Sequence, residues 1–223
     1  MNMSRSANSS NASPLQEGRL TEWLLRGFAV LLLGFIVLRW GHAWLNEPAR
    51  LSLLFLLLAE SYTLLLVLFA RRASQRDMSV PAMLATTYAM GFILLLEPQG
   101  TLRLAPEWLG VMLQVLSIAW QFTAKVFLGR SFGLLPAQRG LVVSGPYRFV
   151  RHPIYFGYLV GHVGFLLVNF SWRNALVLGV LYAAQVLRIQ REEAVLALAD
   201  GQAGDDYLQY RARVRWRLLP FVY

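Results

Sequence analysis

A short stretch of aromatic, basic and turn-forming residues is the part of this sequence best suited to chemistry. Residues 144–157 read SGPYRFVRHPIYFG, in which a Gly-Pro pair predicts a turn and Pro153 predicts the first position of a helix. The free N–H groups and the positive dipole at such a helix start suit an anionic ligand group such as a carboxylate. Tyr147 and Tyr155 add flat aromatic faces that suit an adenine or a sulfonium cation. We therefore expect a binding site for a ligand that carries such groups.

A second set of candidate residues follows further along the chain. Arg188 and Glu192 are four positions apart, so on a helix they share one face, whereas Glu193 points elsewhere. If two neighbouring antiparallel helices carry the two sets, the corner from His152 to Tyr155 meets the corner from Arg188 to Glu192. The alternative for Arg188 and Glu192 is a surface salt bridge worth less than about 1 kcal/mol.

The elements that must position these residues are apolar helices. The chain is 57% hydrophobic and only 15% charged, which is too apolar for a soluble globule. Its apolar runs are each close to the roughly 20 residues with which a helix crosses a hydrocarbon core. The last two are short and closely spaced, which predicts a helical hairpin. We expect an all-α, polytopic membrane protein with about five or six membrane helices, over residues 23–45, 51–70, 79–96, 107–128, 154–170 and 173–190.

Arginines predict how these helices are oriented. The formal net charge is +9, and cations gather after the second, fourth and sixth apolar runs. The positive-inside rule places these segments, both termini and the candidate site in the cytoplasm. We attribute the charge to topology and to anionic membrane lipids, and we expect no nucleic acid partner. The arginines concerned are Arg71, Arg72, Arg76, Arg130, Arg139, Arg148, Arg151, Arg188, Arg191, Arg211, Arg213, Arg215 and Arg217.

Composition divides the chain into three predicted parts. Residues 1–19 are rich in Ser and Asn and predict a disordered tail. Residues 20–128 predict a scaffold of four transmembrane helices. Residues 129–223 contain the candidate site, with a cofactor loop, the hairpin and a C-terminal cover. The sequence has no Cys and only three His, so it predicts neither thiol chemistry nor a metal site.

Ionisable residues inside the apolar runs need an explanation, because the membrane interior makes them costly. Glu60 falls in the middle of the second run, where it is either a site facing a cavity or a protonated carboxyl bonded to a neighbouring helix. Arg26 and Lys125 lie near the ends of runs and are expected to extend to the membrane surface.

The fifth run carries a pattern of small residues. Gly157 and Gly161, with Gly164 one turn on, predict close packing against another helix. His162 is the one histidine in this run, and we expect it to be a polar residue with a hydrogen-bond partner rather than a ligand.

The same stretches resemble a known family over about residues 125–223. The elements are Gly-Pro-Tyr at 145–147, Arg-His-Pro-Ile-Tyr-Phe-Gly at 151–157, Glu-Glu at 192–193, Tyr-Leu-Gln-Tyr at 207–210 and Leu-Pro-Phe at 219–221. In combination they are similar to the isoprenylcysteine carboxyl methyltransferase family and its bacterial relatives. Phospholipid N-methyltransferases share a related pattern.

The resemblance implies transfer of a methyl group from S-adenosylmethionine, bound on the cytoplasmic side, to a lipophilic acceptor that arrives through the bilayer. Arg188 and Glu192 would be the catalytic residues, with Arg188 on the acceptor side. Tyr207 and Tyr210 would close the pocket over the substrate. The residues that the resemblance assigns to the cofactor are Arg139, Gly140, Leu141, Val142, Tyr147, His152, Pro153, Ile154, Tyr155 and Glu192.

The chemistry of the acceptor leaves several functions open. Methyl transfer mainly needs alignment, and it requires no metal or covalent nucleophile. Arg188 could orient a carboxylate by a two-pronged hydrogen bond, which favours carboxyl O-methylation, whereas an amine acceptor would need a base there. The alternatives are a phospholipid N-methyltransferase or a small-thiol S-methyltransferase of the same fold. An alternative of another class is a non-enzymatic membrane protein or small transporter that uses Glu60.

Overall fold

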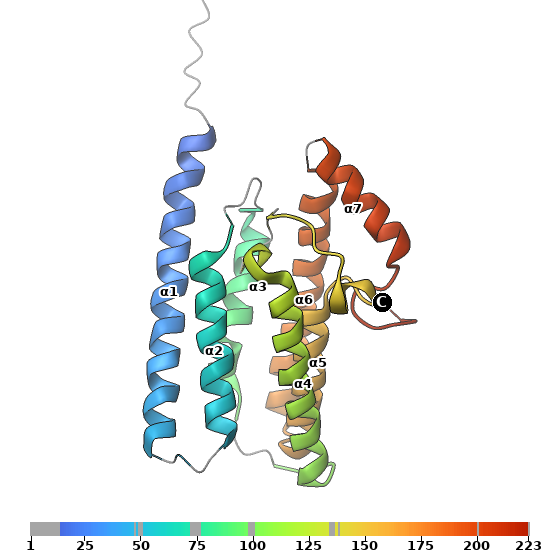
Figure 1. The fold of residues 1–223 in the computed structure, drawn as a ribbon. Coiled ribbons are helices and arrows are strands. Elements are labelled where there is room, and N and C mark those ends of the chain that lie inside the picture. Colours follow the sequence, from blue (N-terminus) through green and yellow to red (C-terminus); the bar gives the residue numbers. More distant parts are fainter. Residues whose placement is uncertain are drawn as a thin grey trace, which may run out of the picture.

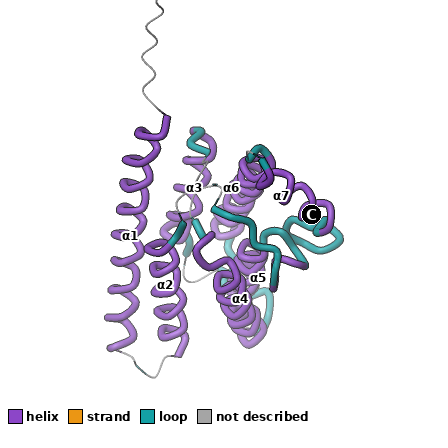
Figure 2. Tube along the Cα trace, turned by 45° about the horizontal axis from the view of Figure 1, so that its top comes forward, coloured by secondary structure: helices purple, strands orange, loops and turns teal. Residues whose placement is uncertain are grey.

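The computed structural model describes residues 14–46, 48, 51–71, 77–97, 101–133, 137, 139–199 and 201–222. In this part of the chain the regular elements are helices, with one isolated bridge between Leu102 and Phe170 and no extended strand (Figure 2). The all-α prediction is confirmed. The α-helices are α1 (Pro14–Asn46), α2 (Leu51–Phe69), α3 (Val80–Gly91), α4 (Glu107–Leu128), α5 (Pro153–Val168), α6 (Trp172–Ala197) and α7 (Gln202–Arg213).

The helices α1 to α6 run alternately up and down a bundle, and α7 lies across one end of it (Figure 1). We call this the α7 end. The ends of α2 and α4 meet there, because the backbone N–H of Arg71 donates to the carbonyl of Arg130 at 2.7 Å. Arg191 near the end of α6 pairs with Asp77 before α3 at 3.5 Å. The described arginines of the three arginine-rich segments therefore share one end, and their cytoplasmic location stays a prediction.

Apolar surfaces support a membrane protein. Among the described residues, Arg26–Asn46 and Glu107–Ser131 are long and apolar enough to cross a membrane, whereas Pro153–Val168 is apolar but shorter. Large apolar side chains point outward from α1 and α4, which a water-soluble chain would bury. They include Trp23, Leu24, Phe28, Leu31, Phe35 and Leu38 on α1, and Trp108, Val111, Val115, Leu116 and Phe122 on α4. The count of five or six spans stays a prediction.

Glycines bring α5 close to α4, as the small-residue pattern predicted. A Cβ added at Gly157 would collide with the side chain of Gln121 on α4. At Gly164 it would lie 2.8 Å from the backbone oxygen of Gly110. Ser117 of α4 uses this proximity to donate a 2.7 Å hydrogen bond to the carbonyl of Gly157. The α4–α5 pair is therefore held at backbone contact distance.

The predicted hairpin of α5 and α6 is present, but the two helices pack mainly on other partners. α5 lies along α4, and α6 lies along α3, where Tyr88 donates to the carbonyl of Val177 at 3.0 Å. The glycine face of α5 is turned to α4, so larger rings occupy the side facing α6. His162 of α5 meets the hydroxyl of Tyr182 of α6 at 2.7 Å, so the prediction of a hydrogen-bonded histidine is confirmed.

The boundaries of α1 and α3 differ from the sequence predictions. α1 begins at Pro14, so residues 14–19 are helical and only residues 1–13 of the predicted tail lie outside the described part. The third predicted helix ends at Gly91 and continues as a tighter 3-10 turn over Phe92–Leu95, since glycine is a poor helix former. Glu60 lies in α2, but its side chain is outside the described part of the chain, so its role stays a prediction.

Lys125 does not extend to the membrane surface, so that prediction is wrong. Only 6% of its surface is exposed, and its Nζ donates a 2.8 Å hydrogen bond to Oγ1 of Thr63. The lysine therefore links α4 to α2 inside the bundle. Arg26 also turns inward, because its Nη2 donates to the carbonyl of Ala70 just after α2 at 2.9 Å.

Candidate functional site

A buried carboxylate at the α7 end joins basic side chains from two segments. Glu193 on α6 is 4% exposed. Its Oε1 accepts a hydrogen bond from Nε of Arg151 at 2.7 Å and lies 3.2 Å from Nε2 of His152. Its Oε2 accepts from Nε of Arg217 at 2.9 Å. We call these four residues the Glu193 cluster.

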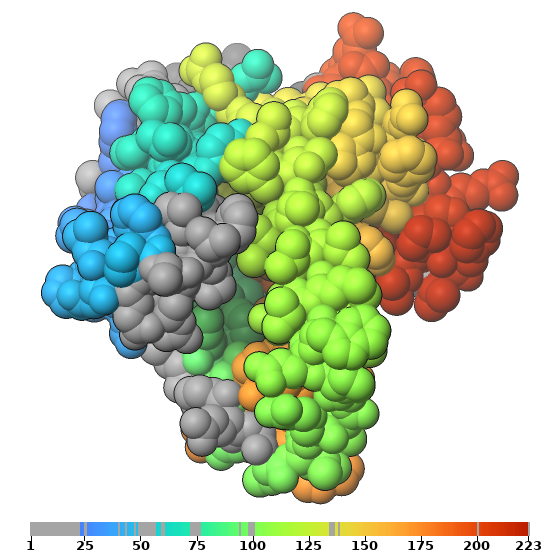
Figure 3. All heavy atoms as spheres, turned by 60° about the horizontal axis from the view of Figure 1, so that its bottom comes forward, coloured from blue at the N-terminus to red at the C-terminus, as the bar shows by residue number. Residues whose placement is uncertain are grey.

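Arg151 also fixes the segment that follows α7. Its Nη1 donates to the carbonyls of Val214 at 2.6 Å and Arg215 at 2.8 Å. The backbone N–H groups of residues 151–152 donate to the carbonyls of residues 216–217, both at 2.9 Å. The space-filling view shows the C-terminal residues in red beside the yellow residues that precede α5 (Figure 3). The chain therefore returns to the start of α5, and the role of this segment as a cover over a cofactor stays a prediction.

The cluster keeps Glu193 ionised. Burial alone would raise the pKa of this carboxyl. The hydrogen bonds from His152 and Arg151, together with their positive charges, outweigh burial and lower the pKa to about 2. At neutral pH the negative charge of Glu193 therefore offsets the buried positive charge around it.

Tyr155, in the first turn of α5, lies between both sets of predicted residues. The Cζ of Arg188 lies 5.4 Å from the centre of its ring, and Glu192 is close enough to act electrostatically on its hydroxyl. The ring of His152 stacks on it with centroids 5.7 Å apart. Arg188 is only 8% exposed and donates to Gln185 at 2.9 Å. The two predicted corners do meet, and Arg188 is too buried to form a surface salt bridge.

Two tyrosines of α7 face inward, where burial leaves them 2% and 3% exposed. The hydroxyl of Tyr210 donates to the carbonyl of Tyr147 at 2.6 Å. The hydroxyl of Tyr207 is buried, and no described residue offers it a hydrogen-bond partner. Burial raises the pKa of Tyr147, Tyr207 and Tyr210, so all three stay protonated and can donate.

The predicted cofactor loop crosses from the scaffold to α7. The carbonyl of Arg139 accepts a 3.2 Å hydrogen bond from Ser131. Gly140 has a φ of +107°, and a Cβ there would lie 3.0 Å from Nη1 of Arg71, so glycine suits this position on both counts. Leu141 packs against the buried tyrosines of α7. Residues 139–141 therefore contact both the turn after α4 and helix α7.

The remaining predicted residues lie nearer the scaffold. Pro153 is fully buried, and its carbonyl accepts a 2.9 Å hydrogen bond from Nε1 of Trp120. The side chain of Ile154 packs on the core between α1 and α2, which includes Leu66. Val142 is half-buried. The carbonyl of Pro153 and the side chain of Ile154 therefore fix the position of α5 in the bundle.

The sequence prediction did not single out Glu193, Arg151 or Arg217 as a group. A partial signal exists, because Glu193 is four residues after Ile189, which is fully buried. Residues four apart share a helix face, so Glu193 continues the inward face of α6. Nothing in the spacing indicates Arg217, which lies 24 positions further along the chain.

Comparison with known proteins adds a family relationship for the middle of the chain. The curated proteins contain no match to it. Tyr207, Tyr210 and Arg217 lie beyond residue 199, the last residue that a family model matches. Residues 104–199, which contain α4, α5 and α6, match the phospholipid methyltransferase family, and this match supports a membrane methyltransferase.

Proposed function

We propose that this protein is an S-adenosylmethionine-dependent methyltransferase of the membrane that methylates a lipophilic acceptor. The phospholipid methyltransferase family, which residues 104–199 match, generally uses S-adenosylmethionine. One observation carries the proposal. Tyr155 at the start of α5 lies beside both Arg188 and Glu192 of α6, and α7 bonds to Tyr147 shortly before α5.

The residues at this place fit the cofactor. The rings of Tyr155 and His152 offer flat faces to an adenosine or a sulfonium, and Glu192 can accept hydrogen bonds from it. The hydroxyl of Tyr207 is a buried donor that the described residues leave unused, and such a group is costly unless a ligand satisfies it. When bound, S-adenosylmethionine supplies a methyl group attached to a positively charged sulfur. Together with Tyr147 and the loop 139–142, these residues would hold it and exclude water.

Arg188 is the residue that would orient an acidic acceptor. Its guanidinium is planar, stays charged and matches a carboxylate with two parallel hydrogen bonds. It is buried between α5 and α6, where water weakens such bonds less than at the surface. A carboxylate acceptor is already a nucleophile at neutral pH, so no side chain has to remove a proton from it. This arrangement favours carboxyl O-methylation.

A second candidate is methylation of a phospholipid amine, and the family match favours it. An amine must lose its proton before it can act as a nucleophile. Glu192 is a carboxylate beside Tyr155, so it could hold the ammonium form and accept that proton. The two candidates share the cofactor residues and differ in whether Arg188 or Glu192 contacts the acceptor.

Cofactor binding can be tested apart from catalysis with two tyrosine variants. Purified protein in detergent is titrated with S-adenosylmethionine by calorimetry. We expect Tyr207→Phe to weaken binding about tenfold, or ~1.4 kcal/mol, because it removes the unused buried donor. The control is Tyr88→Phe, which removes a hydroxyl bonded to Val177 between α3 and α6. Equal affinities in the wild type and Tyr207→Phe would remove Tyr207 from the site, and absence of binding in the wild type would overturn the proposed function.

The acceptor can be identified with a methyl-labelled donor and lipid extracts, followed by mass spectrometry. A methyl ester is cleaved by mild alkali with release of labelled methanol, whereas an N-methyl group survives this treatment. Alkali-labile product therefore supports a carboxylate acceptor, and alkali-stable product on an amine supports the second candidate. Arg188→Lys should abolish ester formation while leaving S-adenosylmethionine affinity within about twofold.

A further inference from the structure

The last described residues form a turn that exposes apolar side chains. Phe221 and Val222 are 86% and 75% exposed. Among the described residues, Phe221 alone combines a side chain with a positive φ, which is +66°. This left-handed conformation costs free energy for residues other than glycine. A strained turn that exposes a phenylalanine ring indicates a role for that ring.

Backbone bonds fix the level of this turn on the bundle. The N–H groups of Arg151 and His152 donate to the carbonyls of residues 216–217. The ring of Phe221 packs on that of Trp216, with centroids 5.3 Å apart. The turn therefore lies beside the start of α5, at the outer side of the bundle (Figure 1).

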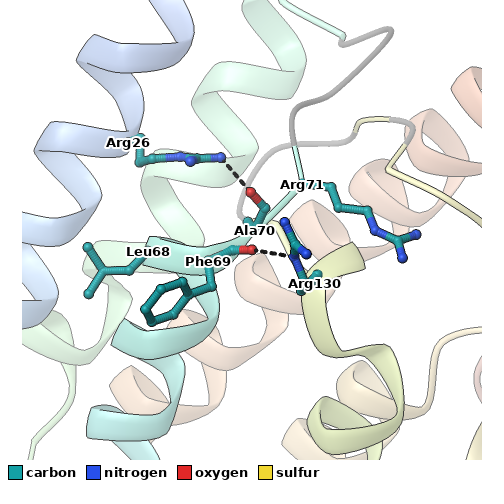
Figure 4. A pocket seen from close by; sticks show the side chains of 6 residues that line it. All are labelled: Arg26, Leu68, Phe69, Ala70, Arg71 and Arg130. Atoms are coloured by element: carbon teal, nitrogen blue, oxygen red, sulfur yellow. Dashed lines mark hydrogen bonds between the residues drawn. The ribbon is translucent and has the colours of Figure 1, made fainter.

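Other arginines mark where the apolar helices end at the α7 end. Nη2 of Arg26 donates to the carbonyl of Ala70 at 2.9 Å, and Nε of Arg130 donates to that of Phe69 at 3.2 Å (Figure 4). Arg26 begins one long apolar segment, and Arg130 lies one residue before the end of another. Cations at the ends of apolar helices are typical of a membrane surface. This surface would therefore lie near Arg26 and Arg130.

The start of α5 lies deeper than these arginines. Nε1 of Trp120 on α4 donates to the carbonyl of Pro153 at 2.9 Å. Trp120 precedes Arg130 by ten residues, a distance of about 15 Å along a helix. The exposed turn at residues 221–222 is thus held at a depth where α4 still has a lipid-facing surface. The exposed apolar residues of α4 between the two levels are Phe122, Val126 and Phe127.

A basic stretch leads into the turn. Residues 207–223 contain four arginines and no acidic residue. Arginine side chains are long enough to reach charged headgroups while neighbouring residues contact acyl chains. An anionic membrane surface therefore fits both the turn and the stretch before it. Three of the four arginines are exposed and have no acidic partner in the part of the chain that the structure describes, namely Arg211, Arg213 and Arg215.

We propose that the turn inserts into the membrane surface at the α7 end, with anionic lipids as its partner. Phe221 and Val222 contact the acyl chains, and the lipid phosphates bind Arg211, Arg213 and Arg215. Guanidinium groups form paired hydrogen bonds to phosphate, and aromatic rings suit the boundary between headgroups and hydrocarbon. Apolar and electrostatic attraction act together in such surface anchors. The anchor is independent of the proposed methyl transfer, which requires none of these side chains.

The test uses single cysteines, because the chain has none of its own. A fluorophore on Val222→Cys is compared with two references in vesicles of phosphatidylcholine and phosphatidylglycerol. Leu116→Cys is exposed on the apolar helix α4, and Gln202→Cys is exposed at the first residue of α7. Lipids brominated on their acyl chains quench the fluorophores that they touch, whereas acrylamide quenches those that face water.

We expect brominated lipid to quench residue 222 as it quenches residue 116, and acrylamide to quench residue 202 alone. Bromine at successive acyl positions should report a depth of about 5 to 10 Å below the headgroups. If acrylamide quenches residue 222 as strongly as residue 202, the turn faces water and the anchor is overturned. Protection from both quenchers would also overturn it, because another protein segment or a second copy would then cover the turn.

The choice of lipid is tested by placing bromine on one lipid at a time. Brominated phosphatidylglycerol should quench residue 222 more strongly than brominated phosphatidylcholine at equal fractions. R213Q/R215Q should lose most of this preference, whereas R103Q/R173Q, which removes two exposed arginines outside the α7 end, should keep it. Equal quenching by both lipids in the wild type, or equal loss in both variants, would overturn the role of the arginines.

Discussion

Nε of Arg151 and Oε1 of Glu193 lie 2.7 Å apart, with both side chains at most 6% exposed. This ion pair joins the residue two positions before α5 to the last part of α6. Arg217, in the segment after α7, donates to the other oxygen of Glu193. A single carboxylate on α6 therefore holds both the segment before α5 and the segment after α7. Removing one partner from a buried pair leaves an uncompensated charge, which is far more harmful than the loss of a surface pair.

Glu193→Gln should therefore lower the free energy of unfolding by about 3 to 5 kcal/mol, since Arg151 and Arg217 would lose their counter-charge. Chemical unfolding in detergent measures the change. Glu192→Gln is the matched control at the next position, and we expect a clearly smaller loss there because Glu192 is only half-buried. A larger loss for Glu192→Gln would show that the cluster does not stabilise the fold.

Acid should destabilise the protein through the same carboxyl. The pKa of Glu193 is about 2 in the fold, against an ordinary value of 4.5. Its stabilising effect is therefore fully present above pH 4.5 and is lost as the pH falls from 4.5 towards 2. Melting temperatures measured across this range should fall more steeply for the wild type than for Glu193→Gln. Parallel curves would contradict the assignment.

The two inward tyrosines of α7 should separate stability from binding. Tyr210→Phe removes the 2.6 Å bond to the carbonyl of Tyr147 and should cost about 1 to 3 kcal/mol, because it leaves a buried acceptor unpaired. Tyr207→Phe removes a hydroxyl without a partner in the described structure, so stability should hardly change. Hydrogen exchange of α7 should rise in Tyr210→Phe alone. Faster exchange in both variants would show that Tyr207 also holds α7 down.

Glycine substitutions test the contact between α4 and α5. A Cβ at Gly164 would lie 2.8 Å from both the backbone oxygen of Gly110 and Cβ of Leu113, so Gly164→Ala should push the helices apart and lower the melting temperature. Gly179→Ala on α6 is the control, because a Cβ there meets no atom within 4 Å. That change should be neutral or stabilising by up to about 1 kcal/mol, since alanine is the better helix former.

Sequence patterns predicted the parts of the fold and site that depend on residues close together in the sequence. Pro153 marks the start of α5, and the four-residue spacing of Arg188 and Glu192 brought both to Tyr155. Glu193 was not predicted, because adjacent residues on a helix point about 100° apart and packing decides which one is buried. The sequence also did not determine which helix packs on the glycines of α5, since any neighbouring helix could have done so.

The return of residues 214–217 to the start of α5 has a consequence for biosynthesis. A ribosome delivers the chain from its N-terminus, so α5 and α6 are made before the residues that bond to the backbone of Arg151 and His152. Until Arg217 has emerged, the residues that we propose to hold the cofactor lack their contacts with this segment. If the proposed function holds, a chain still being made should be unable to retain S-adenosylmethionine until residues 214–217 have been added.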